Sequence, residues 1–302
     1  LTPAKLCAGG SCGNVLSILG FLGWKSYPIA RLSNNNASDK LFIDFSNFGI
    51  DTSLISKSDD GATPVIIHRI LKDKNGNPKH RFEFRIPESN IWLPSYKPLL
   101  ASAVQRIITD QPFSNIYYFD RVSRSTIDLA KYYKSVGALI VFEPSSIKQD
   151  KQLEECLKLV DIIKFSHDRI NNYSEIFPDP ICKLEIQTLG NDGLQYRVQS
   201  DLKKNWKKIP PYTFNEIIDT AGAGDWCTAG IINELGYDGI KSFDDADENK
   251  IENALKIGQV LGGINCNYDG ARGIMYNMNI TSLVNLAEAI INGKHVPNIE
   301  TT

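Results

Sequence analysis

The sequence predicts an α/β fold in which a mainly parallel sheet is sandwiched between helices and carries a small β lid. From Pro98 onward, helix-like segments alternate with short apolar segments, a pattern typical of a parallel sheet covered on both faces. Two β-prone runs within residues 62–87 flank an Asn-Gly pair, which predicts an antiparallel hairpin. We therefore expect a single α/β domain over residues 1–302, with the hairpin as an appendage.

The composition narrows the class of protein. The chain has 302 residues, is 42% hydrophobic and carries a formal net charge of -2, which argues against a dedicated nucleic-acid or membrane-surface protein. Its 6 cysteines are scattered without a CxxC pair, so we expect free thiols in a reducing compartment. No signal peptide or apolar run of transmembrane length is apparent. We expect a cytoplasmic protein with no nucleic-acid or membrane partner.

Residues 9–48 begin with two glycines and continue as a helix–strand–helix pattern. Glycines at 23 and 49 follow the two apolar helical runs and are expected to end them. The predicted elements are a helix over Val15–Leu22, a strand over Tyr27–Leu32 and an amphipathic helix over Ala37–Phe48.

The hairpin follows. Its predicted strands are Pro64–Leu71 and His80–Ile86, joined by a turn within Asp73–Pro78. Charged and aromatic residues alternate over Arg81–Arg85, as expected for a strand with one solvated face. An isolated hairpin is only marginally stable, so this one must pack against or cover something.

The central and C-terminal parts supply the sheet and most of the helices. Expected strands are Ile116–Phe119, Ala138–Phe142, Asp161–Phe165, Lys183–Leu189 and Leu194–Gln199, the last two joined by a tight turn at Gly190–Gly193. Expected helices are Leu99–Ile108, Ser125–Val136, Lys151–Leu159, Gly224–Leu235, Asn249–Asn265 and Ser282–Ile291. The acidic cluster at 244–248 is interpreted as a solvated helix start rather than a metal site.

The most informative stretch is the heptad Asp219-Thr220-Ala221-Gly222-Ala223-Gly224-Asp225. We expect a strand over Phe214–Ile218 before it and a helix over Trp226–Leu235 after it. Glycines let the backbone approach a ligand, and the following helix start offers free N–H groups, so the heptad suits an anion or a phosphoryl group. Asp225 is then placed to accept a proton from a hydroxyl nucleophile. The alternative is a Gly-rich turn in which Asp225 caps the helix.

Several separated motifs together resemble the ribokinase/PfkB family of ATP-dependent sugar and nucleoside kinases. They are Gly9-Gly10-Ser11-Cys12-Gly13-Asn14, Gly49-Ile50-Asp51-Thr52, Thr188-Leu189-Gly190-Asn191-Asp192-Gly193, the heptad, and Asp269-Gly270-Ala271 near the end. They occur in the family's order and span nearly the whole chain. The resemblance implies a ribokinase-like three-layer sandwich with a β-sheet lid.

The resemblance also implies roles for individual residues. It makes Asp225 the catalytic base and Gly222, Ala223 and Gly224 the anion hole. The expected substrate-binding residues are Gly10, Asn14, Phe82 and Phe84. Those expected to bind ATP are Thr188, Gly190, Gly193, Gln259 and Gly270. Asp219 and Glu143 are the candidate metal ligands, with a monovalent cation expected near Asp219.

Simpler interpretations remain open for some of these residues. Asn14 suits a helix cap as well as a sugar contact. Phe82, Phe84 and Trp92 suit packing of the lid against the body as well as stacking on a sugar. His167 follows a strand near the expected phosphates, but a structural role fits it equally.

The chain departs from the family pattern in three places. The family's first strand, with a sugar-binding Asp, has no counterpart before Gly9, and we interpret it as omitted from the numbered sequence. Ser166-His167-Asp168-Arg169 replaces the family's Asn-x-x-Glu, and Phe142-Glu143-Pro144-Ser145 replaces Phe-Asp-Pro-Asn. Because an arginine would repel a metal, the Mg²⁺ site is expected to be altered.

We therefore predict an ATP- and Mg²⁺-dependent carbohydrate kinase acting on a fructose- or ribose-like monosaccharide, with a homodimer through the lid as a further expectation. A nucleoside kinase is the nearest enzymatic alternative. A kinase-like regulatory protein without activity is the non-enzymatic one, although a base inside an anion hole argues against it.

Overall fold

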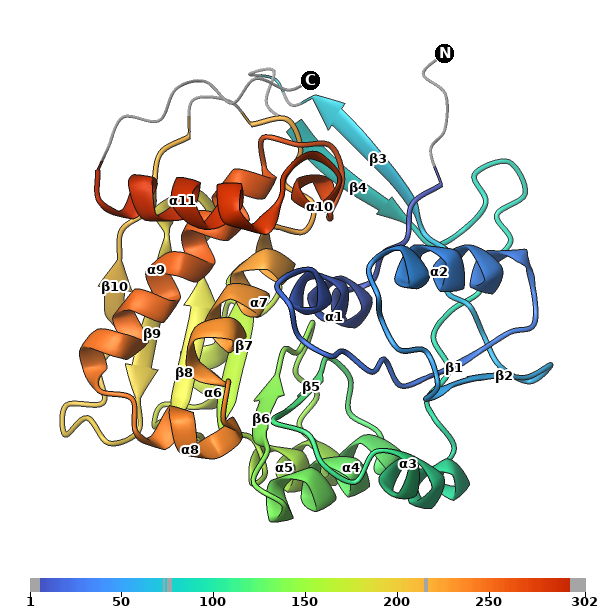
Figure 1. Cartoon of the computed structure of the whole chain (residues 1–302), viewed down its shortest axis with the longest axis horizontal. Coiled ribbons are helices and arrows are strands. Elements are labelled where there is room, and N and C mark those ends of the chain that lie inside the picture. Colours follow the sequence, from blue (N-terminus) through green and yellow to red (C-terminus); the bar gives the residue numbers. More distant parts are fainter. Residues whose placement is uncertain (1–5, 73, 75–77, 215–216, 294–302) are drawn as a thin grey trace.

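The computed structural model describes residues 6–72, 74, 78–214 and 217–293. The chain folds into a three-layer α/β sandwich from which a small antiparallel sheet projects (Figure 1). The central sheet has 6 strands in the order β10-β9-β8-β7-β6-β5. Strands β5 to β8 are parallel, and β9 and β10 continue the sheet antiparallel. The predicted mainly parallel sheet is confirmed.

The strands of the central sheet coincide with apolar runs of the sequence. Their bounds are β5 Ile116–Phe119, β6 Leu139–Phe142, β7 Ile162–Ser166, β8 Leu184–Thr188, β9 Leu194–Val198 and β10 Lys207–Ile209. Parallel strands that are buried on both faces need continuous hydrophobic runs rather than alternation. β6, with the sequence Leu-Ile-Val-Phe, is buried at every residue.

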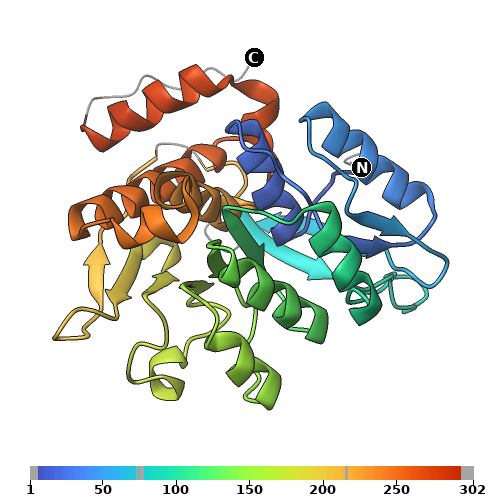
Figure 2. The same ribbon diagram turned by 60° about the horizontal axis from the view of Figure 1, so that its bottom comes forward.

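Side chains of alternate strand residues enter two separate hydrophobic cores. Leu139 and Val141 face one core, whereas Ile140 and Phe142 face the other. The first core packs the sheet against α1 Ser11–Phe21, α7 Ala223–Leu235, α9 Glu248–Asn265 and α11 Ile280–Ile291. The second packs it against α3 Val104–Asp110, α4 Arg124–Ser135, α5 Lys151–Leu157 and α6 Tyr173–Ile176 (Figure 2).

Helices α7 and α9 pack at very short range. A Cβ at Gly230 would lie 3.0 Å from Gly258 Cα, and a Cβ at Gly262 would lie 2.6 Å from Ala223 O. Small residues therefore let α9 press against the start of α7, where the heptad ends. The acidic cluster starts α9 as predicted, since the Asp247 side chain accepts from Lys250 N.

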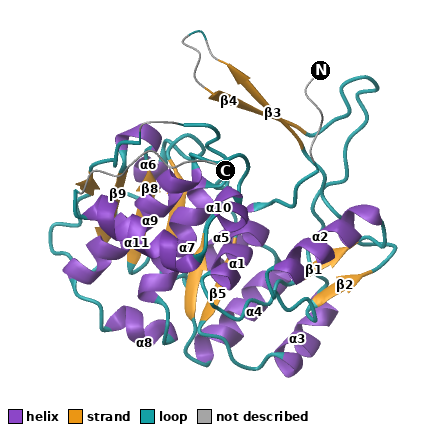
Figure 3. Ribbon diagram, turned by 45° about the horizontal axis from the view of Figure 1, so that its top comes forward, coloured by secondary structure: helices purple, strands orange, loops and turns teal. Residues whose placement is uncertain are grey.

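A smaller layer lies beside the sandwich and carries the hairpin. It contains the parallel pair β1 Ala30–Leu32 and β2 Ile55–Lys57 together with α2 Asn36–Asn47. The hairpin strands β3 Ile67–Lys72 and β4 Pro78–Glu83 are antiparallel and extend away from the sandwich (Figure 3). Of the predicted turn, residues 73 and 75–77 lie outside the described residues.

One predicted strand is wrong. Of the segment Phe214–Ile218 the structure describes Phe214, Ile217 and Ile218, and none of them is in a strand. Instead, Ile218 N donates to Cys266 O at the end of α9. The Phe214 ring occupies the space beside Gly263, where a Cβ would come within 1.9 Å of it. Phe214 and Ile218 therefore contact α9 and the residue at its end rather than pairing in the sheet.

Three short helices of the described residues were not predicted: α6, α8 Gly239–Asp244 and α10 Gly273–Asn277. The short strands β2 and β10 were not predicted either. Two 3₁₀ turns, η1 Ala101–Ala103 and η2 Gly190–Asp192, complete the regular structure. Within the described residues, none of the helices combines the length and the apolar character needed to cross a bilayer.

Candidate active site

The residues singled out from the sequence lie along one continuous hollow. It runs from the hairpin, past the starts of α1 and α7, to the turn after β8 and the face of α9. All of the candidates line it: Gly10, Asn14, Phe82, Phe84, Glu143, Thr188, Gly190, Gly193, Asp219, Gly222, Ala223, Gly224, Asp225, Gln259 and Gly270. The fold thus gathers segments from both ends of the chain.

The heptad forms the turn into α7. Gly222 is the N-cap in the left-handed region, with φ 78°, and a Cβ there would lie 2.3 Å from Ala271 O. Both constraints require glycine. Gly224 is different, because its Cβ would meet only Lys164 Nζ and Glu143 Oε1, at 3.7 and 3.9 Å. At Gly222, therefore, the close approach that the glycine permits is to the backbone of Ala271 and not to a ligand.

The first turn of α7 offers backbone donors toward the hollow. Ala223 N donates to Thr220 O and Trp226 N to Gly222 O. The amides of Gly224 and Asp225 lie between these two, in the turn where a helix has no preceding carbonyls of its own to satisfy its N–H groups. Such a turn attracts anions through its donors and its dipole.

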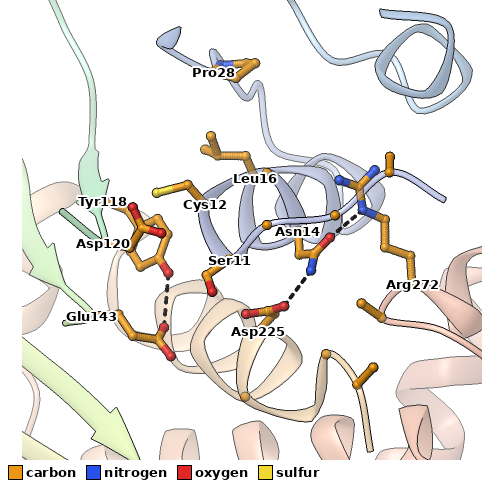
Figure 4. A pocket seen from close by; sticks show the side chains of 18 of the residues that line it. Ser11, Cys12, Asn14, Leu16, Pro28, Tyr118, Asp120, Glu143, Asp225 and Arg272 are labelled. Carbon is orange, nitrogen blue, oxygen red and sulfur yellow. Dashed lines mark hydrogen bonds between the residues drawn. The ribbon is translucent and has the colours of Figure 1, made fainter. Parts of the chain in front are cut away.

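Asp225 stands at this turn, with its carboxylate facing Asn14 at the start of α1 (Figure 4). Its Oδ2 accepts a 2.6 Å hydrogen bond from Asn14 Nδ2 at the start of α1. Burial, followed by the nearby Glu143 carboxylate, raises the pKa of Asp225 to about 7; the Asn14 hydrogen bond, Lys164 and Arg169 act in the opposite direction. A carboxyl group with a pKa near neutrality is suited to proton transfer.

Glu143 is held by three protein donors. Its Oε1 accepts from Lys164 Nζ at 2.8 Å, and its Oε2 accepts from Thr228 Oγ1 at 2.6 Å and from the Tyr118 hydroxyl at 3.1 Å. Burial is the largest effect on the pKa of Lys164 and lowers it, but Glu143, Cys227 and Asp225 together outweigh burial, so the pKa lies above its ordinary value. Lys164 also donates to Gly224 O at 3.1 Å, which ties β7 to the first turn of α7.

Asp219 is held by backbone donors. Its Oδ1 accepts from Ala221 N at 2.9 Å and its Oδ2 from Gly270 N at 3.0 Å, joining the heptad to the turn before α10. Within the described part of the chain, no group of three or more His, Cys, Asp or Glu side chains is arranged to hold a metal ion. Asp219 and Glu143 thus accept hydrogen bonds from protein donors, and their role as metal ligands stays a prediction.

The far end of the hollow contains the candidates for nucleotide binding. Thr188 ends β8, and Gly190 and Gly193 bound the following 3₁₀ turn. A Cβ at Gly193 would lie 2.3 Å from Ile209 O, so β9 and β10 close tightly around this turn. Gln259 reaches from α9 toward Pro210 O at 3.5 Å.

The hairpin presents aromatic side chains to the hollow. Phe82 and Phe84 are 51% and 53% exposed, and Phe82 stacks on His68 with ring centroids 4.6 Å apart. Trp92 lies under the Arg85 guanidinium at 4.0 Å. Aromatic faces left exposed beside a hollow can stack on a ligand.

The residues at the end of β7 and directly after it have two different surroundings. Ser166, Asp168 and Arg169 line the hollow, and Arg169 is near enough to Asp225 to act against the rise of its pKa. His167 lies with its Nδ1 3.2 Å from Gln187 Nε2 on β8, a contact that fits the structural interpretation.

Three residues of the site were missed from the sequence. Asp120 directly follows β5, and burial raises its pKa, whereas Arg121 and a hydrogen bond with Cys12 act in the opposite direction. Ligands bind beyond the carboxyl ends of parallel strands, so this position gave a usable signal. Lys164 was also detectable, as a lysine inside an apolar strand. Arg272, which donates from Nε to Asn14 Oδ1 at 2.9 Å, had no sequence signal.

A known protein resembles this chain in sequence. No family model matches the chain. Among curated proteins, a probable fructokinase-7 of Arabidopsis thaliana is 27% identical over 188 residues, which are 55% of this chain. The matched part spans about half, 52%, of that relative's length.

Solved structures match over much more of the chain. An ATP-bound fructokinase from Xylella fastidiosa superposes with a TM-score of 0.71 at 16% identity, covering 93% of this chain and 91% of that one. An aminoimidazole riboside kinase from Salmonella enterica gives 0.68 at 18%, covering 94% and 95%. The inosine complex of a Burkholderia thailandensis nucleoside kinase gives 0.67 at 14%, covering 94% and 86%. The fold is therefore ribokinase-like, as the resemblance to the ribokinase/PfkB family implied.

Proposed function

We propose that this chain, with its ribokinase-like fold, catalyses ATP-dependent phosphorylation of a hydroxyl group on a fructose- or ribose-like sugar. The observation that carries the proposal is Asp225, a carboxyl group whose pKa is raised to about 7 within the anion-binding first turn of α7. A protein that only binds a ligand has no need of a proton acceptor in that position. The fructokinase relatives favour a sugar acceptor.

The geometry supports a direct transfer between two bound molecules. The acceptor hydroxyl would lie beside Asp225, which takes its proton as the oxygen attacks the terminal phosphorus of ATP. The amides of Gly224 and Asp225 would stabilise the charge on the transferring group. Lys164, fixed by Glu143 and Gly224 O, holds this turn in position.

The two substrates would occupy opposite ends of the hollow. We assign the sugar to the end lined by Gly10, Asn14 and the hairpin residues Phe82 and Phe84. ATP would lie along the second end. That end is lined by Thr188, Gly190, Gly193, Gln259 and Gly270. A lid of this kind excludes water, which protects ATP from hydrolysis.

Mg²⁺ is proposed to enter with ATP rather than on the protein. Because Glu143 and Asp219 accept hydrogen bonds from protein donors, the ATP phosphates are the better ligands. Arg169, on the same hollow, would add positive charge beside them. A monovalent cation near Asp219 and a homodimer through the hairpin remain predictions of the family resemblance.

A nucleoside acceptor is the second candidate, since riboside and nucleoside kinases are among the similar structures. The test is ATP consumption by the purified chain with a panel of ketohexoses, pentoses and nucleosides. A sugar turned over with the highest kcat/KM would support the proposal, and preference for a nucleoside would replace it. Binding of ATP without turnover on any acceptor would favour the non-catalytic alternative.

A further inference from the structure

Arg272 is a buried arginine that neither the motifs nor the proposed chemistry explains. It stands just after Ala271, at the N-cap of the short helix α10, and is 3% exposed. Its Nη1 forms an ion pair with Asp44 on α2, whose Oδ1 also accepts from the Tyr276 hydroxyl at 2.8 Å. Its Nε donates to Asn14 Oδ1 at 2.9 Å.

As a purely structural residue, Arg272 would be a costly choice. Within the described residues its Nη2 is buried without a hydrogen-bond partner. An orphaned buried donor destabilises the folded state. Buried ion pairs are often no more stabilising than apolar residues of the same volume. A function other than stability is therefore needed to account for the guanidinium.

The chain of contacts leads to the base. Asn14 lies between Arg272 and Asp225, with Oδ1 toward Arg272 Nε and Nδ2 toward Asp225 Oδ2 (Figure 4). A guanidinium has only donors and an ionised carboxylate has only acceptors, so a single orientation of the Asn14 carboxamide satisfies both neighbours. A flipped carboxamide would point its NH₂ at the guanidinium and its oxygen at the carboxylate.

We propose that Arg272 is a positioning residue that locks the Asn14 carboxamide with its NH₂ toward Asp225. The lock holds Oδ2 of Asp225 and leaves Oδ1 of Asp225 to face the acceptor hydroxyl. The proposal rests on the proposed function for its catalytic consequence, but its physical content is the orientation of one amide. Without Arg272, a protonated Asp225 would accept either orientation of Asn14.

The lock has a defined consequence for ionisation. The Asn14 hydrogen bond stabilises the carboxylate form and lowers the pKa of Asp225 against the effects of burial and of Glu143. Loss of the lock should therefore raise this pKa. The other groups that act on the carboxylate come from several elements, and the test must hold them constant: Tyr118 on β5, Glu143 after β6, Lys164 on β7 and Arg169 after β7.

Arg272→Lys is the informative change. Lysine keeps a positive charge opposite Asp44, but a single ammonium cannot span Asp44 and Asn14 as the guanidinium does. We expect the pKa of Asp225 to rise by about one unit, the order of shift that a lost hydrogen bond to the charged form produces. Turnover would then fall about tenfold at acidic pH and recover at high pH, where Asp225 is ionised in both proteins. A merely structural loss would lower the rate at every pH.

The matched control is Arg197→Lys. Arg197 is also buried, at 2% exposed, and pairs with Glu185 on the neighbouring strand. This variant should lose stability without shifting the ionisation of Asp225. If Arg272→Lys does not fold, the double variant Arg272→Met with Asp44→Asn removes both charges of the pair, and it should show the same upward shift.

Direct titration of the Asp225 carboxyl by NMR, with its signal assigned from Asp225→Asn, tests the lock without requiring activity. The decisive comparison adds Arg272→Lys to Asn14→Leu, which has no amide to orient. No further shift in that background supports the lock. The same shift there, or no shift in Arg272→Lys alone, overturns it. If Arg272→Lys raises the pKa of Asp225 but the wild-type protein phosphorylates no acceptor, the lock stands and the proposed function is refuted.

Discussion

Replacing Asp225 with asparagine should separate activity from stability. Asparagine has nearly the shape of aspartate and can still accept the hydrogen bond from Asn14 Nδ2, so the first turn of α7 is expected to persist. An amide cannot accept the proton of the attacking hydroxyl. Loss of a general base costs about 10²- to 10⁴-fold in rate, and we expect a fall in kcat of that size with ATP binding retained.

The same substitution should stabilise the protein above neutral pH. The pKa of Asp225 is raised from 3.8 to about 7, chiefly by burial. Between these values the folded protein holds a proton that the unfolded chain has lost, so stability falls as pH rises through this window. The shift of about three units corresponds to at most about 4 kcal/mol, at 1.36 kcal/mol per unit. Because the side chain borders the open hollow, solvent screening reduces the expected gain in Asp225→Asn to about 1–2 kcal/mol at pH 8.

The measurement is the free energy of unfolding by urea for both proteins across the pH range from 4 to 8. The two curves should converge at the acidic end and separate steadily toward pH 8. Asp51→Asn is the control of opposite sign, because hydrogen bonds from Ser53 lower the pKa of Asp51, so this substitution should cost stability above the unfolded pKa. Equal stabilities of wild type and Asp225→Asn at pH 8, or near wild-type turnover of the variant, would refute the raised pKa or the role as base.

Three further predictions follow from the site. Gly222→Ala should fold poorly and lose activity, since its Cβ would lie 2.3 Å from Ala271 O, whereas Gly224→Ala should fold, its Cβ meeting only side-chain atoms; equal melting temperatures for the two variants would contradict this. Arg169→Glu restores the family's acidic residue, and a loss of ATP affinity that Mg²⁺ cannot rescue would support a phosphate contact of Arg169. Tighter Mg²⁺ dependence with ATP affinity kept would indicate a degraded ligand position. No change in ATP affinity or Mg²⁺ dependence would exclude both roles. Phe82→Ala removes a ring that is 51% exposed, so it should raise the KM for the sugar with unfolding free energy changed by no more than about 0.5 kcal/mol; an unchanged KM would limit Phe82 to packing.

The sequence by itself determined most of the strands and helices and singled out the stretch on which the catalytic proposal rests. Strands such as β6 were predictable because a parallel strand buried on both faces must be apolar throughout. The hairpin followed from its turn residues and its alternation. The heptad could be interpreted because glycine at a helix start and a carboxylate one turn in have local physical meanings. The roles of the remaining site residues came from the family resemblance.

Tertiary structure decided what each of those residues touches. Phe214 and Ile218 are residues that also suit a strand, but they contact α9 and its end, because packing and not composition chooses between a sheet edge and a helix surface. Glu143 is a candidate metal ligand from the sequence, and only the structure shows that Lys164 lies beside it. Arg272 is 258 residues from Asn14 in the chain. No local pattern encodes a contact between such distant residues; it exists because packing of α1 against α7 and the turn before α10 brings both residues to the base.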